Sequence, residues 1–229
     1  MTCAVAAVAL LGSGVAQAET RTGWIGPTPP VNGTVYLHTS TIDNGGIPTA
    51  STRIYTSFGS SVAPGTMGAK ARLFREGALC SATDYRFNAF ITNAQNAATT
   101  RDCGAGFYNS HGFVAVLNPT NGALSETVTF PTDPLQYPPA ASARQQNSAP
   151  EGESGVNGDG VSYGEALGVQ DDADLPELIS AIGTDGQAGY IRSSDLTAGA
   201  ADPAAEPAVR TVPLLTRDGE AIGTFEISS

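Results

Sequence analysis

The chain has 229 residues, of which 41% are hydrophobic and 14% charged, with 27 Gly, 15 Pro and 3 Cys. The apolar content is too high for a disordered polymer, Gly lacks the period of collagen, and three Cys are too few for a disulfide-dense miniprotein. The net charge of −11 opposes binding to polyanions, because phosphate recognition depends on Lys and Arg contacts. We therefore expect no nucleic-acid partner.

The first 18 residues have the pattern of a secretory signal peptide. An apolar stretch covers residues 4–15, and the small-x-small triplet Ala16–Ala18 precedes Glu19, as at a signal cleavage site. A membrane-spanning helix needs about 20 apolar residues, and Gly12 interrupts this stretch earlier. We therefore predict a secreted protein, extracellular or cell-wall associated, with no stable membrane span after signal cleavage. A buried or disordered apolar N-terminus is the alternative.

Cys3 lies inside the predicted signal peptide, which leaves Cys80 and Cys103 in the mature chain. Two cysteines in an exported protein most economically form one disulfide, and we expect that bond here. The alternative is a catalytic or zinc-binding thiol. No Cys-x-x-Cys spacing occurs, and neither His38 nor His111 lies at a zinc-ligand interval from either cysteine.

Charge divides the rest of the chain into two regions. Residues 19–139 carry seven acidic and seven basic side chains, whereas residues 140–229 carry fifteen acidic and four basic ones. A stretch rich in Pro, Gln, Ser and Gly lies between them and offers few apolar side chains to bury. We therefore predict a first domain over 19–137, a linker over 138–160 and an acidic domain over 161–229.

The first domain is predicted to be a β-sandwich braced by the disulfide. Its apolar runs are short, partly alternating and rich in β-branched and aromatic residues, and turns containing Gly or Pro separate them. No helical period of useful length occurs. Residues 107–117 and 123–130 flank a turn and are expected to form a hairpin. The other predicted strands cover residues 34–39, 52–58, 69–74 and 86–92.

The acidic domain carries two further hairpin signals. Asp185-Gly186 and Asp218-Gly219 each join two strand-like runs, which together span residues 178–192 and 209–227. The whole chain is therefore predicted to be all-β.

The first of these hairpins resembles the central hairpin of bacterial SH3-like (SH3b) domains. The run from Leu178 to Leu196 contains a strand, an Asp-Gly turn, the triplet Gly189-Tyr190-Ile191 and a Ser-rich step before a closing Leu. Tyr190 stands where these domains commonly have Trp. The resemblance implies a small SH3-like β-barrel or meander in an exported bacterial protein, of a class often concerned with cell-wall glycan or peptide. The overall layout also resembles that of secreted actinobacterial proteins, a likeness that implies no activity.

The best catalytic pattern is Gly160-Val161-Ser162-Tyr163-Gly164, which matches the G-x-S-x-G nucleophile elbow. That elbow needs a strand before the Ser and a helix after it, with the acid and the His following in the chain. Here a Gly-, Asn- and Asp-rich stretch precedes Ser162, and both histidines come earlier. We therefore assign no catalytic residue and expect structural roles for His38 and His111. A Ser hydrolase with another chain order is the alternative.

Four aromatic side chains are candidates for a glycan-stacking platform: Trp24, Tyr36, Tyr108 and Tyr190. Aromatic rings bind sugars through their faces, but in small β domains they also supply much of the core. Both interpretations stand at this stage. An exposed shared face would support the first, and burial would support the second.

Asp171, Asp172 and Asp174 form the candidate metal site, for a hard cation such as calcium. Their spacing does not match the D-x-[DN]-x-[DN]-G loop with a distal Glu. A solvated acidic loop is the alternative. No other cofactor is expected.

These observations predict a secreted, non-catalytic binding protein that acts at or beyond the bacterial cell envelope. Its expected partners are cell-wall glycan or peptide, or a basic protein. One alternative is an extracellular hydrolase of wall or glycan. Another is a secreted enzyme inhibitor that presents a disulfide-braced loop over residues 94–102.

Overall fold

The computed structural model describes residues 18–137, 153–197 and 208–228. The predicted signal peptide, apart from its last residue, and most of the predicted linker lie outside these ranges. The described chain is nearly all β, with one short helix, α1 (Ser193–Thr197), and one 3₁₀ turn, η2 (Asp172–Asp174). The predicted all-β fold is confirmed.

One layer of the N-terminal region is a five-stranded antiparallel sheet. Its strands show the alternating burial expected of a half-buried sheet, with one face on the core and one in solvent. The sheet comprises β1 (Thr20–Thr22), β3 (Tyr36–Asp43), β4 (Thr49–Thr56) and β9 (Ala94–Thr100) in that order, with β2 (Gly26–Pro27) also paired to β3.

The second layer is a four-stranded sheet that packs against the first. Its order is β12 (Leu124–Val128), β11 (Phe113–Leu117), β5 (Met67–Lys70) and β8 (Arg86–Phe87). Tyr36, Ile54 and Ala97 of the first sheet share a buried cluster with Met67 and Val114 of the second. This cluster is the core of the predicted β-sandwich.

The third sheet joins the two halves of the chain. Its order is β13 (Leu135–Tyr137), β10 (Gly106–Ser110), β6 (Arg72–Arg75), β7 (Ala78–Thr83), β19 (Ala221–Ser228), β18 (Arg210–Leu215), β17 (Ala188–Arg192), β16 (Leu178–Ile182), β15 (Ser162–Gly164) and β14 (Gly155–Val156). In the chain, β5 is followed by β6 and β10 by β11, each after a short interruption. Since β6 pairs with both β10 and β7, the sandwich passes directly into this sheet.

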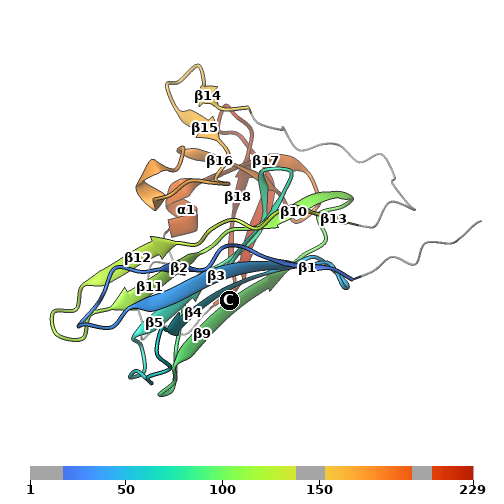
Figure 1. Ribbon diagram of the computed structural model, residues 1–229. Helices are drawn as coiled ribbons and strands as arrows, with labels where there is room; N and C mark the ends of the chain where they lie inside the picture. Colours follow the sequence, from blue (N-terminus) through green and yellow to red (C-terminus); the bar gives the residue numbers. More distant parts are fainter. Residues whose placement is uncertain (1–17, 138–152, 198–207, 229) are drawn as a thin grey trace, which may run out of the picture.

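Within this sheet, five strands close into a barrel. β7 pairs with β19 on one side and with β16 on the other, both in parallel, while β19, β18, β17 and β16 pair antiparallel in sequence. Phe74 and Leu79 from the N-terminal region fill the interior together with Ile179, Ile191 and Phe225. Figure 1 shows the orange and red C-terminal strands against the end of the blue-to-green sandwich.

The predicted boundary between residues 137 and 161 therefore does not separate two independent modules. The barrel is incomplete without β7, which ends more than 90 residues before β16, the next barrel strand in the chain. The two predicted hairpins of the acidic region are present as β16–β17 and β18–β19. The kinship with SH3b domains stays a prediction.

Two local predictions are wrong. Residues 86–92 were expected to form a strand, but only Arg86 and Phe87 do so, because the Asn88 side chain bonds the main chain of Met67, Ala63 and Phe90 and holds a loop instead. The second concerns the inhibitor alternative, which placed a presented loop over residues 94–102. Their first seven residues are strand β9, paired with β4 along its whole length.

Polar contacts join the barrel to the sandwich. The Arg210 guanidinium donates two hydrogen bonds of 2.7 Å to the Asp84 carboxylate and one of 3.0 Å to the Asp195 carbonyl. Lys70 donates from Nζ to the Leu196 carbonyl at 3.4 Å. In the described residues, no helix has the length and hydropathy needed to cross a membrane.

A truncation in β7 should destabilise both regions at once. Leu79→Ala removes a fully buried side chain from the barrel core, so we expect the free energy of unfolding to fall by about 2–5 kcal/mol. Calorimetry should show one cooperative transition, shifted to lower temperature. Leu124→Ala, at a half-exposed position on β12, is the matched control. Two separate transitions, with only one of them shifted, would contradict the shared-strand architecture.

Candidate functional site

The four candidate aromatic residues do not form a binding platform. Tyr36 lies in the sandwich core, Tyr190 packs against Leu178 and Leu215, and Tyr108 is almost fully buried. Only Trp24 is exposed, at 82% of its surface. The platform prediction is wrong for the three tyrosines, because a ring in the core offers no face to a sugar.

The candidate calcium residues lie in and beside the 3₁₀ turn η2. The Asp171 carboxylate accepts a hydrogen bond from the Ala173 amide at 2.9 Å, and the Asp171 carbonyl accepts one from the Asp174 amide at 3.0 Å. The Asp172 side chain lies outside what the structure describes. Among the residues that were described, no three His, Cys, Asp or Glu side chains converge as metal ligands. The geometry gives no support to a calcium site.

The Ser162 region has no hydrolase geometry. Ser162 begins strand β15, and its hydroxyl accepts a hydrogen bond from the Glu177 amide at 3.0 Å. Both histidines are buried in the N-terminal region, and in the described ranges neither contacts Ser162. The elbow also lacks the helix that should follow the Ser.

A hollow of the surface lies where the sandwich meets the barrel. It consists of two adjoining pockets of about 480 Å³ and 420 Å³, both lined by Thr184. We call it the junction groove. Its walls come from β6, β7, β9, β19, the segment after β9 and the β16–β17 turn, through Arg75, Ser81, Ala98, Thr99, Thr100, Arg101, Asp102, Cys103, Gly104, Thr184, Asp185, Gly186, Glu226 and Ser228.

The disulfide lies under this groove. The predicted bond between Cys80 and Cys103 is present, with 6.1 Å between their Cα atoms. It links β7 to the segment that follows β9, and both cysteines belong to a buried cluster that includes Leu73, Leu135 and Ile182. The groove floor is therefore tied covalently to the strand that both regions share.

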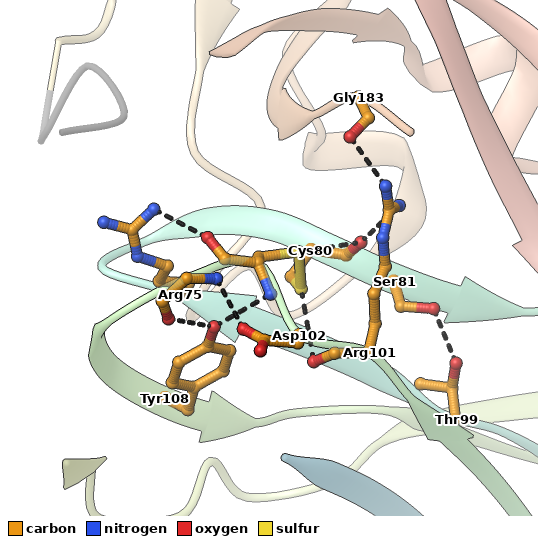
Figure 2. Close-up of a disulfide and its surroundings, with 10 residues drawn as sticks. Arg75, Cys80, Ser81, Thr99, Arg101, Asp102, Tyr108 and Gly183 are labelled. Atoms are coloured by element: carbon orange, nitrogen blue, oxygen red, sulfur yellow. Dashed lines mark hydrogen bonds between the residues drawn. A yellow bond between two sulfur atoms is a disulfide. The ribbon is translucent and has the colours of Figure 1, made fainter. Parts of the chain in front are cut away.

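The Arg101 side chain bridges two walls of the groove. Its guanidinium donates to the Cys80 carbonyl at 3.0 Å and to the Gly183 carbonyl at 2.6 Å, and so connects β7 to the β16–β17 turn. Figure 2 shows this side chain extended between the two carbonyls. Burial lowers the pKa of Arg101, while the nearby carboxylates of Glu226 and Asp185 act in the opposite direction.

A second arginine, Arg75, lines the pocket of about 420 Å³. Arg75 is buried and donates from Nη1 to the Cys103 carbonyl at 2.9 Å (Figure 2). Beside it, the Tyr108 hydroxyl donates to the Gly104 carbonyl at 2.6 Å and accepts from the Cys103 amide at 3.0 Å. Burial is the main cause that raises the pKa of Tyr108, so its hydroxyl stays a donor.

Hydroxyl groups line the remaining wall. Ser81 and Thr99 are 2.6 Å apart, Thr99 and Ser228 are 3.1 Å apart, and Ser228 donates to the Ala82 carbonyl at 3.1 Å. These bonds connect β7, β9 and β19 across the groove. The wall is ordered and polar, as a surface that forms hydrogen bonds to a ligand requires.

The groove lining combines hydroxyl, guanidinium and carboxylate groups. In the described part of the chain, no histidine is among its lining residues. Sequence reasoning missed the groove because it missed β7, whose short apolar run Ala78–Thr83 follows the turn at Glu76-Gly77 and was the available signal. No family model, curated protein or solved structure matches this chain.

Arg101→Met should lower the free energy of unfolding without leaving a cavity between the sandwich and the barrel. The variant keeps an aliphatic side chain but leaves the Cys80 and Gly183 carbonyls without their charged donor. We expect a loss of about 2–4 kcal/mol in the free energy of unfolding, measured by urea denaturation. Arg192→Met, at an exposed position on β17, should change it by less than about 1 kcal/mol. Equal effects would show that the two carbonyl bonds contribute little.

His111 should make the protein sensitive to acid. Burial and the adjacent Arg72 lower its pKa from 6.5 to about 3, so the folded state resists protonation that the unfolded state accepts. The contribution of the neutral His111 to the free energy of unfolding is therefore fully present above the pKa of the unfolded state, about 6.5. It is lost as pH falls from there toward 3, by up to about 1.4 kcal/mol per pH unit.

The check is urea denaturation at a series of pH values for the wild type and His111→Asn, whose amide oxygen can accept from Arg72 as the ring does. The variant should lose that part of the acid slope. An unchanged slope would assign the acid sensitivity to other groups, such as the buried His38, whose pKa is also lowered by burial.

Proposed function

We propose that this protein is a secreted, non-catalytic binding protein of the cell envelope and that its ligand occupies the junction groove. The observation that carries the proposal is the groove itself. Two structural regions, a disulfide and a row of bonded hydroxyls combine to hold its walls. The disulfide also fits an oxidising compartment, in agreement with the predicted signal peptide.

The charges in the groove favour ligands that are neutral or basic. Both arginines in its lining direct their guanidinium groups at main-chain carbonyls, whereas Asp102, Asp185 and Glu226 are exposed. The lining therefore carries three carboxylates against two guanidinium groups, and its net charge is negative. Peptides and uncharged glycans fit this charge, and anionic wall polymers do not.

The proposed envelope location rests on the sequence. The signal peptide directs the chain to export, and the resemblance of the β16–β17 hairpin to SH3b domains suggests a wall-derived ligand. The acidic groove narrows that ligand to the peptide or uncharged glycan part of the wall.

Reversing one groove charge should weaken binding. We expect Glu226→Arg to reduce retention by insoluble peptidoglycan, or affinity for wall-derived peptides by calorimetry, at least about tenfold. Glu220→Arg makes the same charge change on an exposed residue of the β18–β19 turn outside the groove and should have little effect. Binding that is unchanged by Glu226→Arg, or lost equally in both variants, would remove the groove as the site.

A further inference from the structure

Strand β9 has one edge that pairs with no other strand in the described chain. It is the last strand of its sheet, with β4 on one side only. The Asn93 carbonyl bonds the Thr56 amide, and the Arg101 amide bonds the Pro48 carbonyl, at the two ends of the β4–β9 register. Since bonded and non-bonded pairs alternate in an antiparallel ladder, residues 93, 95, 97, 99 and 101 bond to β4.

The intervening residues therefore direct their main-chain groups away from β4. Ala98 and Thr100 are two of them, and both line the junction groove. No hydrogen bond joins their amides or carbonyls to other residues in the part of the chain that the structure describes. Nearer the start of β9, the edge is covered, because the Gln95 side chain donates to the Arg86 carbonyl of β8 at 3.0 Å.

This edge lacks the usual protection against strand pairing. Exposed edge strands commonly carry charges, Pro or bulges that prevent another strand from adding. β9 has the sequence Ala-Gln-Asn-Ala-Ala-Thr-Thr, without charge or Pro, and its pairing is regular. At the opposite edge of the same sheet, β1 contains Arg21, which is paired with Glu19. The unprotected segment is thus the one inside the groove.

The opposing wall determines what can approach. Thr184, Glu226 and Ser228 of the barrel lie across the groove from Ala98 and Thr100, so the edge is recessed in a hollow of about 480 Å³. A single extended segment fits such a space, whereas the sheet edge of a second globular copy would meet the barrel. The exposed Glu226 carboxylate matches a basic side chain on that segment.

We propose that the junction groove binds an extended peptide that adds as a strand to the free edge of β9, with a Lys or Arg side chain directed at Glu226. This inference rests on the proposed function and names its ligand class. The main-chain groups of Ala98 and Thr100 supply the pairing, and Glu226 supplies the side-chain preference. Strand addition of this kind obtains affinity from main-chain bonds and specificity from alternate side chains.

The test uses the full chain and a library of synthetic decapeptides that alternate Thr or Val with Ser around one central Lys. Binding is measured by calorimetry, and hydrogen exchange at the Ala98 and Thr100 amides is followed by NMR. We expect exchange at both amides to slow at least tenfold on peptide binding. Replacing the central Lys by norleucine should weaken binding to the wild type but not to Glu226→Gln.

A main-chain readout separates strand addition from other modes of binding in the same groove. Each peptide that binds is methylated on one or the other alternating set of its amide nitrogens. Methylation of one set should abolish binding, and methylation of the other should preserve it. Only one edge of an added strand directs its amides at β9. Ala98→Pro should also abolish binding, and since the Ala98 amide does not bond to β4, the ladder keeps its hydrogen bonds.

Other outcomes would overturn the inference. Peptide binding that is lost in Glu226→Arg but unaffected by Ala98→Pro and by methylation would retain the groove and exclude strand addition. Retention by peptidoglycan without binding of any peptide would leave the proposed function and exclude the peptide ligand. Concentration-dependent dimerisation abolished by Ala98→Pro would assign the edge to a second copy instead.

Discussion

Strand β7 is the constraint on which the rest of the structure depends, because two cores are built on its opposite faces. Ala78 and Cys80 pack into the sandwich, and Leu79 and Ala82 pack into the barrel. All six residues of the strand are buried, which an isolated edge strand could not achieve. The barrel closes only through its parallel pairing with β16 and β19, so the acidic region obtains its fold from the neutral one.

The same junction explains how the charges are divided between structure and surface. Arg75, Arg101 and Lys70 come from the neutral region, and all three donate to main-chain carbonyls at the join. These cations keep their charge, but their donors are directed at main-chain oxygens. The groove lining still carries three carboxylates against two arginines, and two of those carboxylates come from the barrel, whereas residues 19–139 carry no net charge.

The sequence predicted the local features well and the long-range ones poorly. Hairpins at Asp185-Gly186 and Asp218-Gly219, and the Cys80–Cys103 bond, follow from turn chemistry and cysteine count, and all are present. The parallel pairing of β7 with β19 leaves no local pattern, since neither strand is near the other in the chain. Half of the fourteen groove residues are Ser, Thr or Arg, a combination without a motif. The burial of Tyr36 and Tyr108 likewise depends on sheet packing, not on their neighbours in sequence.

Closure of the barrel has a consequence for the order of folding. The bond from Ser228 to the Ala82 carbonyl joins residues 146 positions apart, and β19 is the strand between β7 and β18. Contacts of such separation form late, because a long loop must close before they contribute. The sandwich can form around its own disulfide while the barrel side of β7 is still uncovered. During that interval the folding chain exposes an apolar strand, and the arrival of β19 ends this period of vulnerability to aggregation and proteolysis.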